Sequence, residues 1–150
     1  MKRLNNYINE KLKINKVTYS SQPKDKEELK SILKERLTKD KNANLNDIDV
    51  SKITDMSWLF YDLNPHNIDI SQWDVSNVTD MWGLFYNCMS FNCDLSAWDV
   101  SSVKNMKAVF YDCKKFNCDL SDWNVSKVED MINMFYKCKS LKNKPTWYKE

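Results

Sequence analysis

The stretch WDVSNVTDMWGLFYNCMSFN at residues 73–92 returns 25 positions later as WDVSSVKNMKAVFYDCKKFN at residues 98–117. Related copies precede and follow these two, at residues 48–67 and 123–141. A fixed period between about 20 and 50 residues is typical of stacked repeats, because one such unit cannot bury its apolar face alone. The repetition therefore predicts an array in which each repeat contacts mainly its two neighbours.

Each repeat contains two hydrophobic patterns. Apolar residues first fall at i, i+3, i+4 and i+7, which is the stripe of a helix, as in Met81, Leu84, Phe85 and Cys88. Residues 91–95 then alternate between apolar and polar, which predicts a short strand. We therefore expect an α/β fold over residues 45–141, with one short strand plus one short helix per 25-residue repeat.

Residues 1–44 do not repeat, and we expect them to form a helical N-terminal cap of the same folded domain. Asp25 and Glu28 make a capping pair at the start of a helix. The apolar face of this helix is expected to contain Leu29, Ile32, Leu33 and Leu37. A further short helix is expected around Leu4, Ile8 and Leu12, and residues 142–150 are expected to form a C-terminal tail.

The repeat motif W-D-V-S-x-V-x-x-M-x-x-x-F resembles the BspA-like leucine-rich-repeat family over roughly residues 45–141. The resemblance implies a right-handed leucine-rich-repeat-like solenoid that recognises proteins and has no enzyme activity. Short-repeat members of that family occur in bacterial surface lipoproteins and as stand-alone viral and phage proteins. This chain lacks the export and lipid-anchor signals of the surface members, and so looks like a stand-alone intracellular or phage-type member.

The charge of the chain is segregated along its length. Residues 1–44 hold twelve Lys or Arg against six acids, residues 45–100 one Lys against nine Asp, and residues 101–150 ten Lys against six acids. The net charge of +2 is too small to indicate a nucleic-acid partner. The acidic middle either orients a protein partner or is a solvated Asp ladder that the repeat imposes.

No membrane association is expected. The chain has no apolar run near the roughly 20 residues that a membrane span needs. Its start, MKRLNNYINEKLKINK, is basic but lacks the apolar segment and cleavage site of a signal peptide. We therefore expect a cytoplasmic protein, located in the host cytoplasm if the source is viral.

The five cysteines fall on two repeat positions. The first repeat has Leu63 at one of these positions and Ile68 at the other, so both are expected to be apolar core positions. A metal site at the C-x4-C pairs is the less favoured alternative, and an odd number of cysteines argues against disulfides. No metal or cofactor is therefore expected.

No catalytic site is expected either. His66 is the single histidine, so a Ser–His or Cys–His catalytic pair would depend on it alone. Gly83 is the single glycine, so the chain has no glycine-rich phosphate loop. Asp69, Asp94 and Asp119 recur with the repeat, and are expected to bond turn amides and the serines two residues later. No small-molecule substrate is expected.

The informative residues are those that the repeat does not dictate. Trp82 and Ile132 share one repeat position with Ser57 and Lys107, and Trp58 shares the next with Gly83. Both positions lie between buried Met and Phe residues, so they are expected to face outward. The candidate partner-binding residues are Trp58, Trp82, Tyr61, Tyr86 and Ile132, with Tyr111 and Tyr136 expected to continue the ridge.

Two alternatives remain open for this surface. Either the two tryptophans are exposed and bind the partner, or the N-terminal cap covers them and the binding face is the strand side around Gln72, Ala97 and Asp122. The expected function is a non-enzymatic protein-binding module, since Trp and Tyr are favoured at protein interfaces. The phage-type resemblance implies a narrower version, an inhibitor of a host factor such as a defence nuclease. The alternative class is an adhesive or carbohydrate-binding repeat protein.

Overall fold

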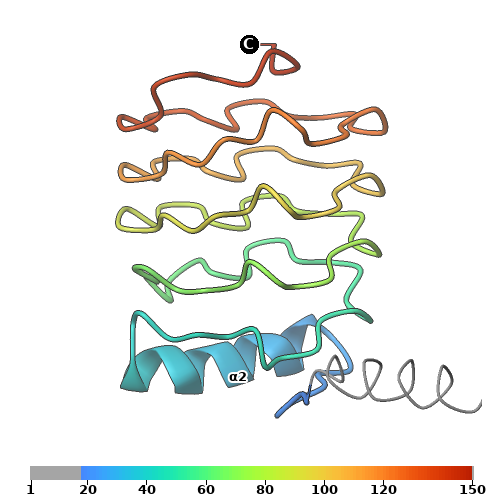
Figure 1. Ribbon diagram of the computed structural model, residues 1–150, viewed down its shortest axis with the longest axis vertical. Helices are drawn as coiled ribbons and strands as arrows, with labels where there is room; N and C mark the ends of the chain where they lie inside the picture. The colour runs from blue at the N-terminus through green and yellow to red at the C-terminus, as the bar shows by residue number, and fades with distance from the viewer. Residues whose placement is uncertain (1–17, 150) are drawn as a thin grey trace, which may run out of the picture.

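The computed structural model describes residues 18–149, in which the chain winds as a column of stacked, turn-rich coils (Figure 1). Helix α2, at Lys26–Lys39, lies across one end of the column, and the last coil lies at the other. We call the four 25-residue coils rungs one to four, which are residues 48–72, 73–97, 98–122 and 123–147.

Helix α2 begins at the predicted capping pair. The Asp25 carboxylate accepts a hydrogen bond from the Glu28 N–H (2.9 Å), and the Glu28 carboxylate accepts one from the Lys24 N–H (3.0 Å). The predicted apolar face is confirmed, because the core buries Leu29, Leu33 and Leu37 and has Ile32 packed against it. The helix predicted around Leu4, Ile8 and Leu12 lies outside the described residues.

The predicted α/β leucine-rich-repeat-like solenoid is wrong. Within residues 18–149 the chain has one α-helix, α2, and neither a strand plus a helix in each repeat nor a sheet. Neighbouring coils are joined by isolated parallel bridges, namely Ser21–Ile48, Asn44–Asp69, Asp55–Asp80, Asp80–Asn105 and Asn105–Asp130. Most of these bridges join residues 25 positions apart, so the repeats do stack, but as turns.

The backbone hydrogen bonds explain why the predicted repeat helix is absent. In an α-helix each N–H donates to the carbonyl four residues earlier. Here the N–H groups of Met81, Gly83, Phe85 and Asn87 donate to the third rung, and those of Leu84, Tyr86 and Cys88 donate three residues back. Alternate amides thus serve the next rung and the same rung.

Left-handed backbone at fixed positions produces this alternation. Two positions of every rung have positive φ, and they are occupied by Trp58, Gly83, Ala108 and Asn133 and by Asp62, Asn87, Asp112 and Lys137. Left-handed backbone costs roughly 1–2 kcal/mol for most residues and breaks a right-handed helix. The apolar spacing therefore predicted burial correctly and hydrogen bonding incorrectly.

The core consists of aromatic ladders along the column. Stacked Phe rings join successive rungs, with centroids 5.1, 5.6 and 5.7 Å apart in the series Phe60, Phe85, Phe110 and Phe135. Four tryptophans also form a ladder, in which each indole N–H donates over 2.9–3.0 Å to a carbonyl 27 or 28 residues earlier: Trp73, Trp98, Trp123 and Trp147. Trp147 belongs to this ladder although it follows Trp123 by 24 residues and had been assigned to the tail.

The recurring aspartates stabilise turns, as predicted. Asp69 Oδ1 accepts hydrogen bonds from the Ser71 N–H (3.1 Å) and hydroxyl (2.7 Å). The same pair of bonds recurs at Asp94–Ser96 and Asp119–Ser121. These serine bonds stabilise the carboxylates and lower the pKa values of Asp69, Asp94 and Asp119.

Both predicted cysteine positions are in the core. Cys88, Cys93 and Cys113 are buried, Cys118 and Cys138 are half-buried, and all five are free thiols. The thiol of Cys113 donates to the Phe85 carbonyl (2.9 Å), and that of Cys138 to the Phe110 carbonyl (3.0 Å). Burial raises the pKa of Cys88 to about 12, as expected for a buried structural thiol.

Candidate partner-binding surface

A continuous row of aromatic side chains runs along the column outside the core, and we call it the aromatic ridge: Trp58, Tyr61, Trp82, Tyr86, Tyr111 and Tyr136. Trp58 is its centre, with ring centroids 5.6 Å from Tyr61, 5.3 Å from Trp82 and 5.1 Å from Tyr86. Tyr86 stacks on Tyr111 at 4.6 Å. The Tyr111 ring lies 4.9 Å from that of Tyr136.

The single glycine of the chain makes room for Trp58. A Cβ atom on Gly83 would lie 3.0 Å from the Cδ2 and Cε3 atoms of the Trp58 indole. Positive φ alone does not require glycine there, because Ala108 and Asn133 adopt it at the same position of the later rungs. The glycine is therefore needed for the close approach of the indole.

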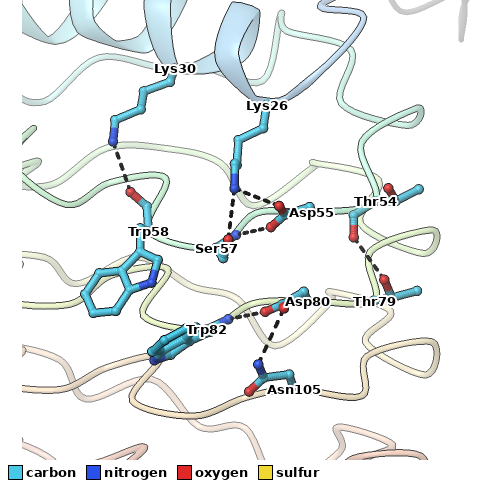
Figure 2. A network of polar contacts seen from close by, with 10 residues as sticks. All are labelled: Lys26, Lys30, Thr54, Asp55, Ser57, Trp58, Thr79, Asp80, Trp82 and Asn105. Carbon is cyan, nitrogen blue, oxygen red and sulfur yellow. Dashed lines mark hydrogen bonds and ion pairs between the residues drawn. The ribbon is translucent and has the colours of Figure 1, made fainter.

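Helix α2 holds the backbone of the first rung beside Trp58. The Lys26 ammonium contacts the Asp55 carboxylate (2.7 Å) and the Ser57 hydroxyl (2.9 Å), and Lys30 donates to the Trp58 carbonyl (3.4 Å). Figure 2 shows the Trp58 indole directed away from the helix and toward Trp82. Helix α2 thus contacts this rung without lying over the indole.

Trp82 presents its indole at the surface. Its backbone N–H donates to Asp80 Oδ1 (2.8 Å), and Asp80 Oδ2 accepts from the Asn105 side chain (3.4 Å, Figure 2). The Lys107 ammonium lies 5.6 Å from the ring centroid, which is a cation–π contact. Trp82 remains 39% exposed.

The tyrosines extend the ridge toward the last rung. The Tyr86 and Tyr111 rings are nearly parallel, with 7° between their planes. Partial burial and then the neighbouring Tyr111 phenol raise the pKa of Tyr86. Tyr136 is 48% exposed, and the Lys137 ammonium lies 5.4 Å from its ring centroid.

The structure brings four of the five predicted residues together. Trp82 and Tyr61 are exposed, whereas Trp58 and Tyr86 are half-buried in the same cluster. Ile132 is 61% exposed but lies in rung four, where it lines a groove of about 900 Å³ with Asn133 and Tyr136. The alternative surface at Gln72, Ala97 and Asp122 is exposed and carries no aromatic residue at these positions.

Sequence reasoning missed two residues that shape the ridge. Lys107 and Gly83 lie at variable repeat positions, and neither was predicted to have a role in the surface. The sequence does contain a signal for Gly83. The preceding repeat has Trp58 at the same position, and a lone glycine next to a tryptophan in a stack indicates that the indole approaches the glycine closely. The Lys107 contact had no signal in the sequence, since a cation–π pair depends on side-chain direction.

Within residues 18–149, no group of three His, Cys, Asp or Glu side chains is arranged to hold a metal ion. In the same part of the chain, no helix combines the length and the apolar character needed to cross a membrane.

Comparison with known proteins gives one match. The family model described as "Mycoplasma protein of unknown function, DUF285" matches residues 27–148, which include helix α2 from its second residue and all four rungs. No curated protein and no solved structure matches the chain.

Proposed function

The chain belongs to the DUF285 family, whose description names no function, and we propose that it is a non-enzymatic protein-binding module that contacts its partner through the aromatic ridge. The exposed Trp82 indole, held within a cluster of contacting rings, carries this proposal. Tryptophan and tyrosine supply most of the binding energy at many protein interfaces. Rings that already contact one another lose little conformational freedom on binding.

The ring faces favour a protein partner over a carbohydrate. A sugar ring needs a free aromatic face to stack on. Tyr86 and Tyr111 cover one face of each other's rings, and Lys107 lies over one face of Trp82, which reduces the free faces of the ridge. The ridge therefore offers ring edges, hydroxyl groups and ammonium groups, which suit protein side chains and carbonyl groups.

The acidic middle of the chain contributes little to the proposal. Asp49, Asp69, Asp74, Asp94 and Asp99 each accept a hydrogen bond from the serine two residues later. Turn formation thus explains most of this charge, and mimicry of nucleic acid is not needed. The narrower proposal, a phage-type inhibitor of a host factor such as a defence nuclease, rests on the family resemblance of the repeat motif alone.

The test compares Trp82→Ala with the matched control Gln72→Ala, which alters an exposed residue outside the ridge. Immobilised wild-type and variant chains are exposed to cell lysate and, in parallel, to a glycan array. We expect the wild type to retain a protein partner, and Trp82→Ala to weaken its binding roughly thirtyfold, or about 2 kcal/mol. Gln72→Ala should bind normally, and both variants should melt near the wild type.

Two results would overturn the proposal. One is binding to glycans, through Trp82, with no protein retained. The other is a protein partner whose affinity is unchanged by Trp82→Ala and by Tyr61→Ala, since both side chains are exposed in the ridge.

A further inference from the structure

At four alternate positions, which start at the Met of each repeat, the backbone N–H groups donate to the rung that follows, while Thr79, Lys104 and Glu129 just before that Met donate to the rung that precedes. Amides of the third rung donate to carbonyls of the fourth, over 2.7–3.0 Å. These pairs are Met106 to Asp130, Ala108 to Ile132, Phe110 to Met134 and Asp112 to Tyr136. The second rung donates to the third, and the first to the second, in the same way. Each rung thus offers a row of N–H donors to the coil that follows it.

The fourth rung has the same row of donors, and within residues 18–149 no further coil accepts from them. The N–H groups of Met131, Asn133, Phe135 and Lys137 have no hydrogen-bond acceptor within residues 18–149. The amides between them are satisfied, because Met134, Tyr136 and Cys138 donate three residues back within the rung. Four donors at alternate positions are therefore left along this edge.

Apolar side chains at the same edge are less covered than their counterparts inside the column. Met106 and Val103 are fully buried, whereas Met131 and Val128 at the same repeat positions are half-buried. The terminal segment covers only part of the edge, where Trp147 stacks on Trp123 and Tyr148 contacts Phe135. The rest borders a groove of about 900 Å³.

A second copy of the chain does not fit this edge in continuation of the column. The surface that would follow in register is the outer side of the first rung. That side is occupied by helix α2, whose Leu29, Leu33 and Leu37 are buried in the core (Figure 1). The molecule that binds this edge must therefore supply backbone carbonyl groups that are not already hydrogen-bonded.

We propose that this edge binds an extended segment of a partner polypeptide, whose carbonyl groups at alternate residues accept hydrogen bonds from Met131, Asn133, Phe135 and Lys137. Backbone pairing of this kind is a common mode of peptide recognition. The fitting segment resembles a rung of this protein, because three successive pairs of rungs already make the same bonds. This site goes beyond the proposed function, which rests on Trp82, although the two surfaces adjoin at Tyr136.

A synthetic peptide with the sequence of residues 103–116, carrying Cys113→Ser, provides the probe. It contains the four residues whose carbonyls accept bonds from the second rung: Asn105, Lys107, Val109 and Tyr111. Amide hydrogen exchange of the full chain is measured by NMR with the peptide, with a scrambled peptide and with neither. We expect exchange at residues 131, 133, 135 and 137 to be fast in the free protein and slowed by the rung peptide only.

Variants and dilution complete the test. Ile132→Glu, at a largely exposed position in the groove, should weaken peptide binding about tenfold or more, whereas Gln72→Glu should leave it unchanged. Equal slowing by the scrambled peptide, or no slowing at saturating rung peptide, would overturn the proposal. Slow exchange at these amides that rises with protein concentration, without peptide, would overturn it in favour of a second copy.

Discussion

The two ends of the column differ in what closes them. At the first rung, helix α2 buries three leucines and its Lys30 bonds to the Trp58 carbonyl, while Lys41, just after the helix, bonds to the Leu63 carbonyl (2.6 Å). At the fourth rung, a row of backbone donors and half-buried apolar side chains lies beside an open groove.

The direction of the hydrogen bonds explains this difference. Along this one row of amides each rung donates to the next, so the last rung is left there with donors. At the first rung, lysines of helix α2 bond the Trp58 carbonyl, the Asp55 carboxylate and the Ser57 hydroxyl, which are acceptors that an ammonium group can satisfy. Backbone donors need carbonyl groups or water, so the last rung is suited to an incoming chain.

The largest expected effect on stability comes from a buried charge, introduced at the same repeat position in the first rung and, for comparison, in the fourth. Met56, under the capped end, is fully buried, whereas Met131 is half-buried. Met56→Asp should abolish folding, because an unpaired buried charge costs several kcal/mol against a total stability of about 5–15 kcal/mol. Met131→Asp should still unfold cooperatively in urea. Equal destabilisation by both would show that the two ends are equally closed.

A smaller effect is expected where the ridge meets the second rung. Gly83→Asn adds a Cβ beside the Trp58 indole but keeps a residue type that tolerates positive φ. We expect a loss of about 1–2 kcal/mol in urea unfolding, because the packed indole must shift. Asn133→Gly, at the same position of the open end, is the control and should change stability by about 0.5 kcal/mol or less. A neutral Gly83→Asn would show that the indole moves freely.

Loss of the ion pair between Arg36 of α2 and Asp47 should have a weaker, pH-dependent effect on stability. Hydrogen bonds from Arg36 and then Ser20 hold the pKa of Asp47 below its ordinary value. The stabilisation is thus present above about pH 4 and is lost as the pH falls through the lowered pKa. Arg36→Gln should cost under about 1 kcal/mol at pH 7, since the pair is partly exposed, and less still at pH 3.

Melting curves of Arg36→Gln and wild type at pH 3 and pH 7 measure this difference. Lys142→Gln, which removes one exposed charge near the open end, is the control and should show no such pH dependence. A destabilisation of Arg36→Gln that grew toward pH 3 would contradict the assignment.

The smallest expected effect is a difference in thiol reactivity, measured on the wild-type chain. Cys113 is fully buried, while Cys138 at the same repeat position is half-buried, and burial raises the pKa of Cys138 to about 12. At pH 8 a thiol reagent should label Cys138 on the order of tenfold faster than Cys113, because access differs between them. Mass spectrometry of timed samples measures the two rates. Equal rates would show that the last rung is as closed as the third.

Part of the fold was predictable because burial follows spacing. The recurrence of Met81 and Phe85 every 25 residues indicated a stack, and the pattern after Asp25 indicated helix α2. The repeat helix was predicted wrongly because i, i+3, i+4 spacing reports which side chains are buried. It does not report which carbonyl each amide reaches. Positive φ at Asn87 and Ala108 had no clear signal in single repeats.

The candidate surface was predictable to a similar degree. Trp58 and Trp82 stood out because the repeat did not require them, and they do lie together. The open edge beyond the fourth rung could not be foreseen, because it depends on the direction of bonds between rungs. The grouping of Ile132 with the tryptophans was not supported by any contact, since Ile132 lines the groove instead.

The sequence by itself determined that the repeats stack, that their Met, Phe, Trp and Cys side chains form the core, and that a helix lies before them. These features depend on residue identity and period, since apolar groups must leave water at every repeat. Only the tertiary structure decided that each rung is built of turns, and that a helix covers one end of the column while a row of backbone donors remains at the other. The row of hydrogen bonds between rungs joins residues 24 positions apart, and its direction is a property of the assembled backbone.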